Sequence, residues 1–254
     1  MILAVDIGNT NIALGGFSGD ELSFVARIST NTLMTEDEYA ARLLGILSMH
    51  KVEAGDVDGA IISSVVPQLN IVMKRAIRLV YGVDALLVGP GIKTGINIHC
   101  DNPSSVGADL ICASVAVNKI YGAPALIVDM GTATKMTVVD KRGAFVGVSI
   151  IPGVLMGLDA LAARTAQLPQ VSLEAPSLVI GKNTVDCMKS GVVYGNAALV
   201  DGMIERINEE VGDNIPVYAT GGLASVIIPH CKHPVVLDEH LVLKGLNIIY
   251  NKNN

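Results

Sequence analysis

One short segment of this chain occurs twice, and the repeat limits the folds that the chain can adopt. The first copy, Leu3–Thr10, reads LAVDIGNT, and the second, Leu126–Thr134, reads LIVDMGTAT. Each copy is an apolar run that ends in Asp-x-Gly and a hydroxyl residue, a pattern typical of a buried strand entering a tight turn. The repeat predicts two equivalent halves that each begin with such a strand.

The sequence that follows each copy predicts an antiparallel hairpin, because β-prone runs flank short turns rich in Gly and Asp. Thr35 and Glu38 have the spacing of a capping box at the start of a helix. The runs predicted as further strands are 60–63 and 216–219, and helical spacing covers 39–49, 70–81, 107–121 and 191–211. Strands that alternate with helices indicate an α/β protein.

The domain boundary has only a weak signal. No Ser-, Gly- or Pro-rich linker divides the 254 residues, so we place the boundary near Gly122-Ala123-Pro124. The expected domains are residues 1–122 and residues 123–254. Half of the residues are apolar, which is enough for each half to bury a core.

Charge and composition exclude several classes of function. The formal net charge is −6 and the chain has no long run of Lys or Arg, which argues against a surface that follows nucleic-acid phosphates. The four cysteines form no C-x-x-C pair, so neither a zinc ribbon nor a thioredoxin-like motif is present. The N-terminus does not resemble a signal peptide and no long apolar segment follows it. We therefore expect a soluble, cytoplasmic protein.

The two Asp-x-Gly turns suit nucleotide chemistry. The carboxylate of Asp6 or Asp129 can hold Mg²⁺ directly or through water, while N–H groups and hydroxyls of the turn face phosphate oxygens. A side chain at Gly8 or Gly131 would stand where the backbone must approach the phosphates. One such turn alone is more often part of an ordinary hairpin, but its duplication favours a triphosphate held from both ends.

Other motifs add one element and remove several alternatives. Thr220-Gly221-Gly222 predicts a strand-ending turn whose backbone can pack against adenine or ribose. The chain lacks the P-loop, the G-x-G-x-x-G fingerprint, the G-x-S-x-G elbow and the H-E-x-x-H zinc spacing. His230, Cys231 and His233 lie between prolines, and we interpret them as part of an ordinary loop rather than a metal cluster.

The two Asp-x-Gly loops and the late Gly-Gly turn stand in the order found in the sugar kinase, Hsp70 and actin superfamily. This resemblance implies an α/β fold of duplicated ribonuclease-H-like (actin-like ATPase) halves. Each half would hold a mixed β-sheet flanked by helices, with an ATP cleft between the halves.

More specifically, the chain resembles the type III pantothenate kinases over essentially its whole length. The matching segments, in order, are DIGNTN (6–11), ISSVVP (62–67), DNP (101–103), GAD (107–109), DMGTAT (129–134), SIIPG (149–153), AQLP (166–169) and IGKNT (180–184). Short motifs that match by chance would not continue in this order. The resemblance implies phosphorylation of pantothenate from ATP, the first step of coenzyme A biosynthesis.

The resemblance also implies a role for each matched residue. Asp109 is the expected base, which accepts the proton of the substrate hydroxyl as that oxygen attacks the γ-phosphate. MgATP is expected, with Asp6 reaching Mg²⁺ through water, and a K⁺ or NH₄⁺ ion is expected beside Asp129. The residues expected to bind ATP are Asp6, Ile7, Gly8, Asn9, Thr10, Asn11, Ile12, Ala13, Thr132, Gly221 and Gly222. The residues expected to bind pantothenate are Gly107, Ala108, Asp109, Leu110, Thr184 and Cys100.

Two positions depart from the family pattern. Leu110 stands where the family has arginine, which removes a planar cation suited to the carboxylate of pantothenate. Cys100 or His99 stands near the place of a family tyrosine. A kinase for another small hydroxy or carboxylate acceptor therefore remains an alternative, as does a nucleotide-binding regulator without turnover. The retained aspartates, Asp6 and Asp109 among them, argue against the regulator.

Some of these residues also have structural explanations that the sequence leaves open. Asp109 can interact with the dipole of the helix that it begins, and Thr184 can cap a helix that runs through Gly191. Lys135 can point at phosphate or at solvent. The resemblance implies a homodimer whose substrate site draws on both subunits, but an apolar stripe such as that of 191–211 is more often part of an intramolecular core.

Overall fold

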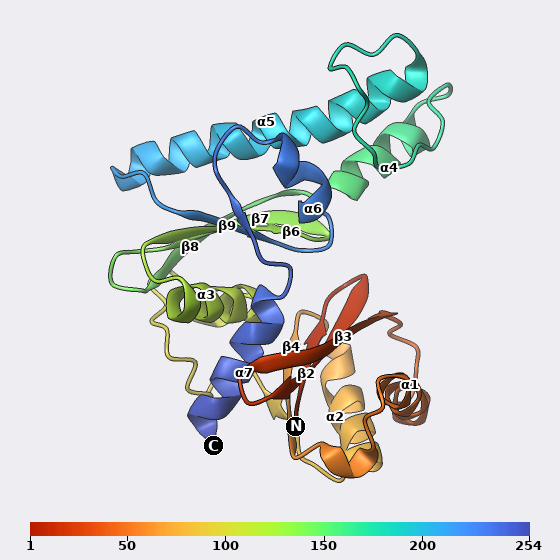
Figure 1. The fold of residues 1–254 in the computed structure, drawn as a ribbon, viewed down its shortest axis with the longest axis vertical. Helices are drawn as coiled ribbons and strands as arrows, with labels where there is room; N and C mark the ends of the chain where they lie inside the picture. The colour runs from red at the N-terminus through yellow and green to blue at the C-terminus, as the bar shows by residue number, and fades with distance from the viewer. The chain divides into compact units, whose positions relative to one another are not determined.

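The computed structural model describes residues 1–254, and the chain forms two compact units (Figure 1). Unit 1 comprises Met1–Tyr121 together with Leu241–Asn254, and unit 2 comprises Gly122–His240. The sequence predicted domains of residues 1–122 and 123–254. The structure differs mainly in the last helix, α7 (Leu241–Asn253), which belongs to unit 1 rather than to the second domain. This helix packs against α3 (Ala108–Ile120) and the first sheet, and Leu243, Leu246 and Ile249 on its apolar face are buried.

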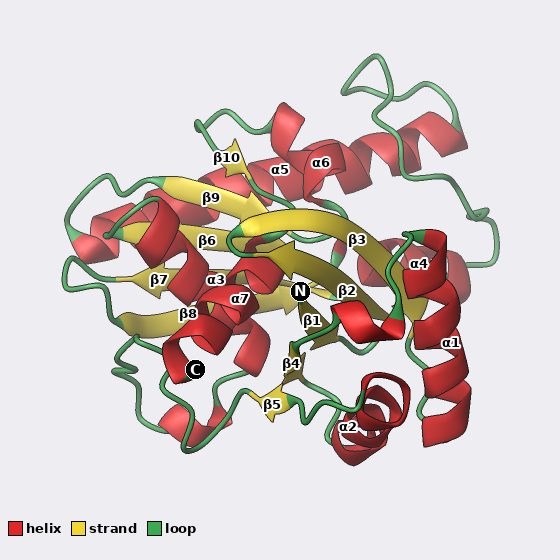
Figure 2. Cartoon of the chain, turned by 60° about the horizontal axis from the view of Figure 1, so that its bottom comes forward, coloured by secondary structure: helices red, strands yellow, loops and turns green.

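The sheet of unit 1 is mixed, in the order β3-β2-β1-β4-β5 (Figure 2). The first three strands form the expected antiparallel hairpins, and β1, β4 and β5 run parallel. The strands are β1 (Ile2–Ile7), β2 (Asn11–Ser18), β3 (Glu21–Ser29), β4 (Gly59–Ser64) and β5 (Leu86–Leu87). The loop at residues 8–10 is therefore the turn between β1 and β2.

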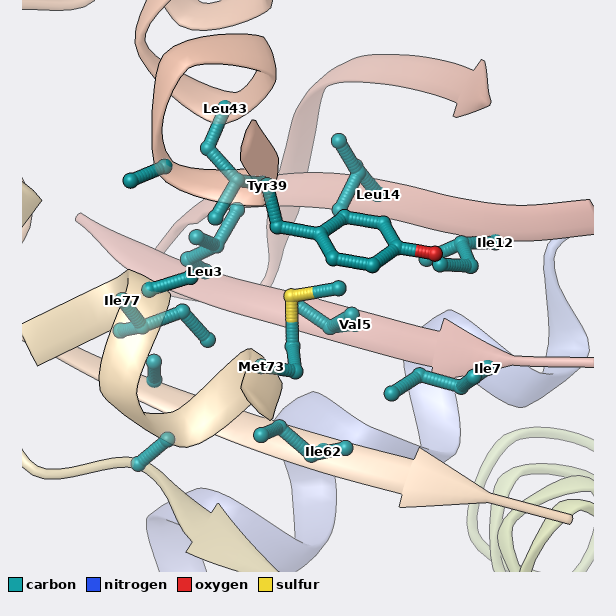
Figure 3. Close-up of a cluster of buried hydrophobic side chains, with 14 of the residues drawn as sticks. Leu3, Val5, Ile7, Ile12, Leu14, Tyr39, Leu43, Ile62, Met73 and Ile77 are labelled. Atoms are coloured by element: carbon teal, nitrogen blue, oxygen red, sulfur yellow. The ribbon is translucent and has the colours of Figure 1, made fainter. Parts of the chain in front are cut away.

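Helices cover this sheet, with α1 (Glu36–Met49) packed against α2 (Gln68–Tyr81), and with α3 packed against α7. Figure 3 shows alternate residues of β1, among them Leu3 and Val5, packed with Tyr39 of α1 and Met73 of α2. These side chains share one face because side chains of a strand alternate between faces. The predicted capping box is confirmed, since Thr35 accepts from the N–H of Glu38 and the Glu38 carboxylate accepts from that of Thr35.

The sheet of unit 2 repeats this arrangement, in the order β10-β9-β6-β7-β8. Strands β6, β7 and β8 are antiparallel, and β6, β9 and β10 run parallel. The strands are β6 (Ala125–Met130), β7 (Ala133–Val139), β8 (Phe145–Pro152), β9 (Val217–Thr220) and β10 (Val236–Leu237). The predicted duplication and the α/β class are confirmed.

The helices of unit 2 differ more from the sequence-based expectation. The helix expected at 191–211 begins earlier, as α5 (Thr184–Val211), because Asn183 caps it by accepting from the N–H of Asp186. The others are α4 (Val154–Arg164) and the short α6 (Ala224–Ile227). Single 3₁₀ turns occupy Ala54–Asp56, Pro103–Ser105 and Ile228–His230. None of the helices combines the length and hydropathy that a membrane span requires.

Candidate active site

The first Asp-x-Gly turn, which we call loop 1 (residues 6–13), lies at the end of β1. The N–H of Gly8 donates to the carbonyl of Asn11 at 3.0 Å, and the Thr30 hydroxyl donates to the Gly8 carbonyl at 2.6 Å. A Cβ at Gly8 would lie 3.0 Å from the Asn11 oxygen, so the turn is tight at this position. Its tip, residues 9–11, is exposed. The turn therefore offers backbone N–H groups and hydroxyls at the surface, as expected of a phosphate loop.

Not every residue of loop 1 offers a side chain to a ligand. Ile7 and Ile12 are fully buried and belong to the apolar core of unit 1. They pair with each other at the base of the turn. Their place in the expected ATP-binding set therefore rests on backbone atoms alone.

The start of α3 lies beside loop 1 within unit 1. Gly107 is the N-cap residue, and Asp109 follows in the first turn of the helix. A Cβ at Gly107 would come within 2.4 Å of Asp109 Oδ1 and 3.7 Å of Val65 Cγ1, so glycine at this position leaves room for the carboxylate in the rotamer that it adopts. Val65 is linked to the end of β1, because its N–H donates to the Ile7 carbonyl at 3.0 Å.

The buried thiol of Cys112 lies within the electrostatic influence of the carboxylates of loop 1 and α3. Burial raises the pKa of the Cys112 thiol well above its usual value, and the nearby negative charges of Asp6 and Asp109 raise it further. The Ser63 hydroxyl, opposite Asp6 on β4, lowers it in part. The structure thus brings together two carboxylates that are far apart in the sequence.

The remaining residues expected at the substrate end of unit 1 contribute no charge. Leu110 is buried and its side chain belongs to the interior of the unit. Cys100 lies in the loop before the Pro103–Ser105 turn and is partly exposed. A cation for a substrate carboxylate is therefore not supplied at either position.

The second Asp-x-Gly turn, which we call loop 2 (residues 129–135), lies at the end of β6. Gly131 donates its N–H to the Ala133 carbonyl at 3.2 Å. Lys135, directly opposite Asp129 on β7, places its Nζ 2.7 Å from Asp129 Oδ2. The sequence alone did not assign Lys135 to the site, although it lies six positions after Asp129 on the far arm of a hairpin, a spacing that permits cross-strand pairing.

Two further glycines press against loop 2. Gly221 has a φ of +93°, and a Cβ there would lie 2.6 Å from the Met130 carbonyl carbon and 2.7 Å from Asp129 Oδ1. A Cβ at Gly153 would lie 2.0 Å from the Thr132 oxygen. The Gly-Gly turn and the Pro152-Gly153 segment therefore support the phosphate loop, which explains why glycine occurs at both positions. Gly222, also expected at the nucleotide, is exposed.

Thr184 lies in unit 2 as the first residue of α5. It is exposed, and the cap of this helix is Asn183, so the alternative role of Thr184 as cap is wrong. A Cβ at Gly181 would lie 2.4 Å from the Cys187 nitrogen, which shows how closely the preceding loop approaches the helix. A pocket of about 650 Å³ at this helix start is lined by Leu161, Leu168, residues 181–184, Cys187, Met188 and Gly191.

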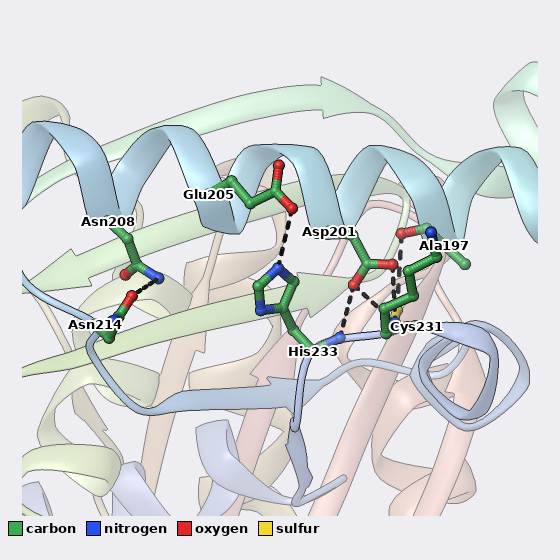
Figure 4. Close-up of polar contacts among 8 residues, drawn as sticks. Ala197, Asp201, Glu205, Asn208, Asn214, Cys231 and His233 are labelled. Atoms are coloured by element: carbon green, nitrogen blue, oxygen red, sulfur yellow. Dashed lines mark hydrogen bonds and ion pairs between the residues drawn. The ribbon is translucent and has the colours of Figure 1, made fainter.

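The histidine and cysteine residues near the end of unit 2 have a structural arrangement (Figure 4). The buried Asp201 carboxylate accepts from the N–H groups of Lys232 and His233 at 2.9 to 3.0 Å. The His233 ring contacts Glu205 at 3.4 Å, and the Cys231 thiol faces backbone carbonyls. These contacts fix the loop against α5.

Comparison with known proteins covers nearly the whole chain. The family model described as type III pantothenate kinase matches residues 2–206. A type III pantothenate kinase of Moorella thermoacetica is 43% identical over 253 residues, which covers 100% of both chains. Two solved structures share the fold at 14% identity. A putative 2-dehydro-3-deoxygalactonokinase from Sinorhizobium meliloti has a TM-score of 0.64, with 99% of this chain and 96% of that chain covered.

The second solved structure is the activator of 2-hydroxyisocaproyl-CoA dehydratase from Clostridium difficile with bound ADPNP. Its TM-score is 0.56, with 99% of this chain and 95% of that chain covered. At this identity the structural matches establish the fold alone, whereas the sequence match to the family extends over most of the chain. The chain belongs to the type III pantothenate kinase family.

Proposed function

We propose that this chain transfers the γ-phosphoryl group of ATP to the primary hydroxyl of pantothenate, which gives 4′-phosphopantothenate in the first step of coenzyme A biosynthesis. Its full-length relative from Moorella thermoacetica carries the name type III pantothenate kinase. The structural observation that carries the proposal is the position of Asp109 at the start of α3, beside Val65, whose N–H donates to the carbonyl of Ile7 in loop 1 at 3.0 Å. This nearness supports a base beside a phosphate loop.

In this mechanism the Asp109 carboxylate accepts a hydrogen bond from the substrate hydroxyl. As the hydroxyl oxygen attacks the γ-phosphorus, its proton passes to Asp109 and the bond between the γ-phosphorus and the β–γ bridging oxygen breaks. ADP leaves with the electron pair of that bond. Loop 1, Thr132 and the Gly221-Gly222 turn hold the phosphates and adenosine of ATP by backbone N–H groups and hydroxyls.

The carboxylates of Asp6 and Asp129 are the candidate ligands for metal ions. We assign Asp6 to Mg²⁺ through water, since Mg²⁺ bound with ATP uses one or two carboxylates, phosphate oxygens and water. The Asp6 carboxylate next to the Ser63 hydroxyl offers the oxygen donors that such an ion prefers. The K⁺ or NH₄⁺ ion expected beside Asp129 fits less well, because that carboxylate already has the Lys135 ammonium group at 2.7 Å.

The test of this function is ADP release by the full chain with MgATP, with and without pantothenate, followed by mass analysis of the product. Pantothenate-dependent ADP together with the mass of phosphopantothenate would support the proposal. ATP binding by calorimetry without stimulation by any acceptor would instead indicate a nucleotide-binding regulator.

A second acceptor class is favoured by one observation. The buried Leu110 supplies no cation at the start of α3, where a substrate carboxylate would need one. A panel of small hydroxy acids and uncharged alcohols, compared by kcat/KM, separates this alternative from pantothenate. A larger kcat/KM for an uncharged acceptor would change the assigned substrate but keep the phosphotransfer chemistry.

We also propose a homodimer, on the basis of exposed apolar side chains in unit 2. Leu178, Val179 and Ile180 are 58%, 65% and 81% exposed just before α5, and Met156 and Leu161 of α4 are exposed as well. Such side chains in a soluble protein commonly mark an interface. Light scattering of wild type and Ile180→Asp would test it, with a monomeric wild type contradicting the proposal.

A cytoplasmic location is supported by the need for ATP.

A further inference from the structure

The ion pair between Lys135 and Asp129 lies at loop 2 and is largely enclosed by the protein. The two side chains are only 18% and 15% exposed, and the separation of 2.7 Å is that of a charge-assisted hydrogen bond. Their positions directly opposite each other on β7 and β6 fix the pair through the sheet itself. The ammonium group is therefore held in place by the fold rather than by a mobile surface contact.

The same carboxylate also faces the turns that are assigned to phosphate. A Cβ built on Gly221 would lie 2.7 Å from Asp129 Oδ1, and a Cβ built on Gly131 would lie 3.6 Å from the same oxygen. One oxygen of Asp129 thus faces the glycine turns while the other contacts Lys135. An uncompensated carboxylate at this point would repel phosphate, and the ammonium group removes that repulsion.

An added monovalent cation does not fit well beside this pair. A K⁺ ion at the Asp129 carboxylate would lie close to the Lys135 ammonium group, and two like charges at one partly buried carboxylate repel each other. A lysine ammonium is itself a compact monovalent cation with three donors. The side chain present can therefore do at this position what a bound ion would do.

We propose that Lys135 supplies, from the chain itself, the positive charge at Asp129 that steadies the ATP phosphates at loop 2. The chain then binds MgATP without a requirement for K⁺ or NH₄⁺. This inference uses the proposed function only in that ATP phosphates bind at loop 2; it does not depend on the acceptor. Lys135 acts here as a positioning residue.

The experiment is calorimetric titration of the full chain with MgATP in choline, potassium or ammonium chloride at equal ionic strength, without any acceptor. The wild type is expected to bind MgATP equally in all three salts. Lys135→Thr removes the charge but keeps a β-prone residue, and its affinity is expected to fall about tenfold in choline chloride, as for loss of a charged hydrogen-bond partner. K⁺ or NH₄⁺ is expected to restore that affinity.

Lys141→Thr is the matched control, because Lys141 forms an exposed ion pair with Asp213 in the same unit. This variant is expected to bind MgATP as the wild type does in every salt. Tighter MgATP binding by the wild type in potassium or ammonium chloride would overturn the proposal, and this measurement needs no variant. Full affinity of a folded Lys135→Thr in choline chloride would overturn it as well. Failure of pantothenate to stimulate ADP release concerns the proposed function only, since these titrations contain no acceptor.

Discussion

Loop 1 and loop 2 have the same place in two equivalent sheets but differ in charge. In each, an aspartate ends a central strand and faces a hydroxyl residue on the parallel neighbour, Ser63 for Asp6 and Thr220 for Asp129. The antiparallel neighbour differs, because Ala13 is opposite Asp6 whereas Lys135 is opposite Asp129. The same arrangement of strands therefore gives the Asp6 and Asp129 carboxylates different electrostatic environments.

This difference suggests a division of roles between the two loops. Asp6 faces Ala13 in its hairpin, and we assign it to a metal ion brought by the nucleotide. Asp129 has a cation from its own hairpin. Unit 1 also adds the carboxylate of Asp109 near loop 1, whereas the glycines of unit 2 support loop 2 by close packing. We infer that unit 1 carries the proton chemistry and that unit 2 mainly holds the nucleotide.

The largest expected effect tests whether proton transfer belongs to unit 1. Asp109→Asn keeps the shape of the side chain but removes the base, so turnover is expected to fall about 10²- to 10⁴-fold. MgATP affinity is expected to remain near that of the wild type. Steady-state ADP release and calorimetry measure the two quantities. Asp84→Asn, in an exposed pair with Arg78, is the control, and unchanged turnover of Asp109→Asn would remove Asp109 as the base.

The next effect separates the two loop aspartates. Asp6→Asn is expected to weaken Mg²⁺-dependent ATP binding about 10- to 100-fold, the range for a lost charged hydrogen-bond partner. Asp129→Asn is expected to retain more affinity, because Lys135 stays charged, but to lower the free energy of unfolding by about 1–3 kcal/mol. Calorimetry and urea denaturation measure these changes. Equal losses of ATP affinity in both variants would break the comparison, and Asp213→Asn serves as the exposed control.

A smaller effect concerns the glycines that support the loops. Gly221→Ala is expected to lower the free energy of unfolding by about 1–3 kcal/mol or more, because its φ is +93° and the new Cβ meets backbone. Gly8→Ala is expected to cost less, since its Cβ meets only the Asn11 oxygen, at 3.0 Å. Gly195→Ala on α5, with open space around it, is the control and should be neutral or stabilising. Urea midpoints that rank in another order would contradict this account.

The smallest effect is a dependence of stability on pH in unit 1. The folded pKa of Cys112 is raised well above 9.0 by burial and by the nearby aspartates, so the unfolded thiol ionises first as pH rises. The buried, protonated Cys112 thiol therefore contributes fully to the free energy of unfolding below pH 9, and this contribution is lost as the pH rises above that value. Urea denaturation between pH 8 and pH 10 should show a decline that Cys112→Ala reduces. Cys231 of unit 2, whose pKa burial raises to about 11, adds a further decline that this variant leaves in place.

Much of the fold was predictable because its signals are local. The two Asp-x-Gly strands, the hairpins after them and the capping box at Thr35 depend on residues that are neighbours in the sequence, and all three are found in the structure. The helix α7 was missed as a part of unit 1, although Leu243, Leu246 and Ile249 have helical spacing. Its place depends on contact with α3, a long-range interaction that no local pattern specifies.

The sequence by itself determined the duplication, the α/β class, the family and the identity of the candidate residues, since each of these depends on residue types in a fixed order. Only the tertiary structure decided which of those residues meet. It placed Asp6 and Asp109 where both influence the same buried thiol, paired Lys135 with Asp129, and made Asn183 rather than Thr184 the cap of α5. The physical reason is that strand register and helix packing fix the distances between side chains, and a linear motif contains no information on those distances.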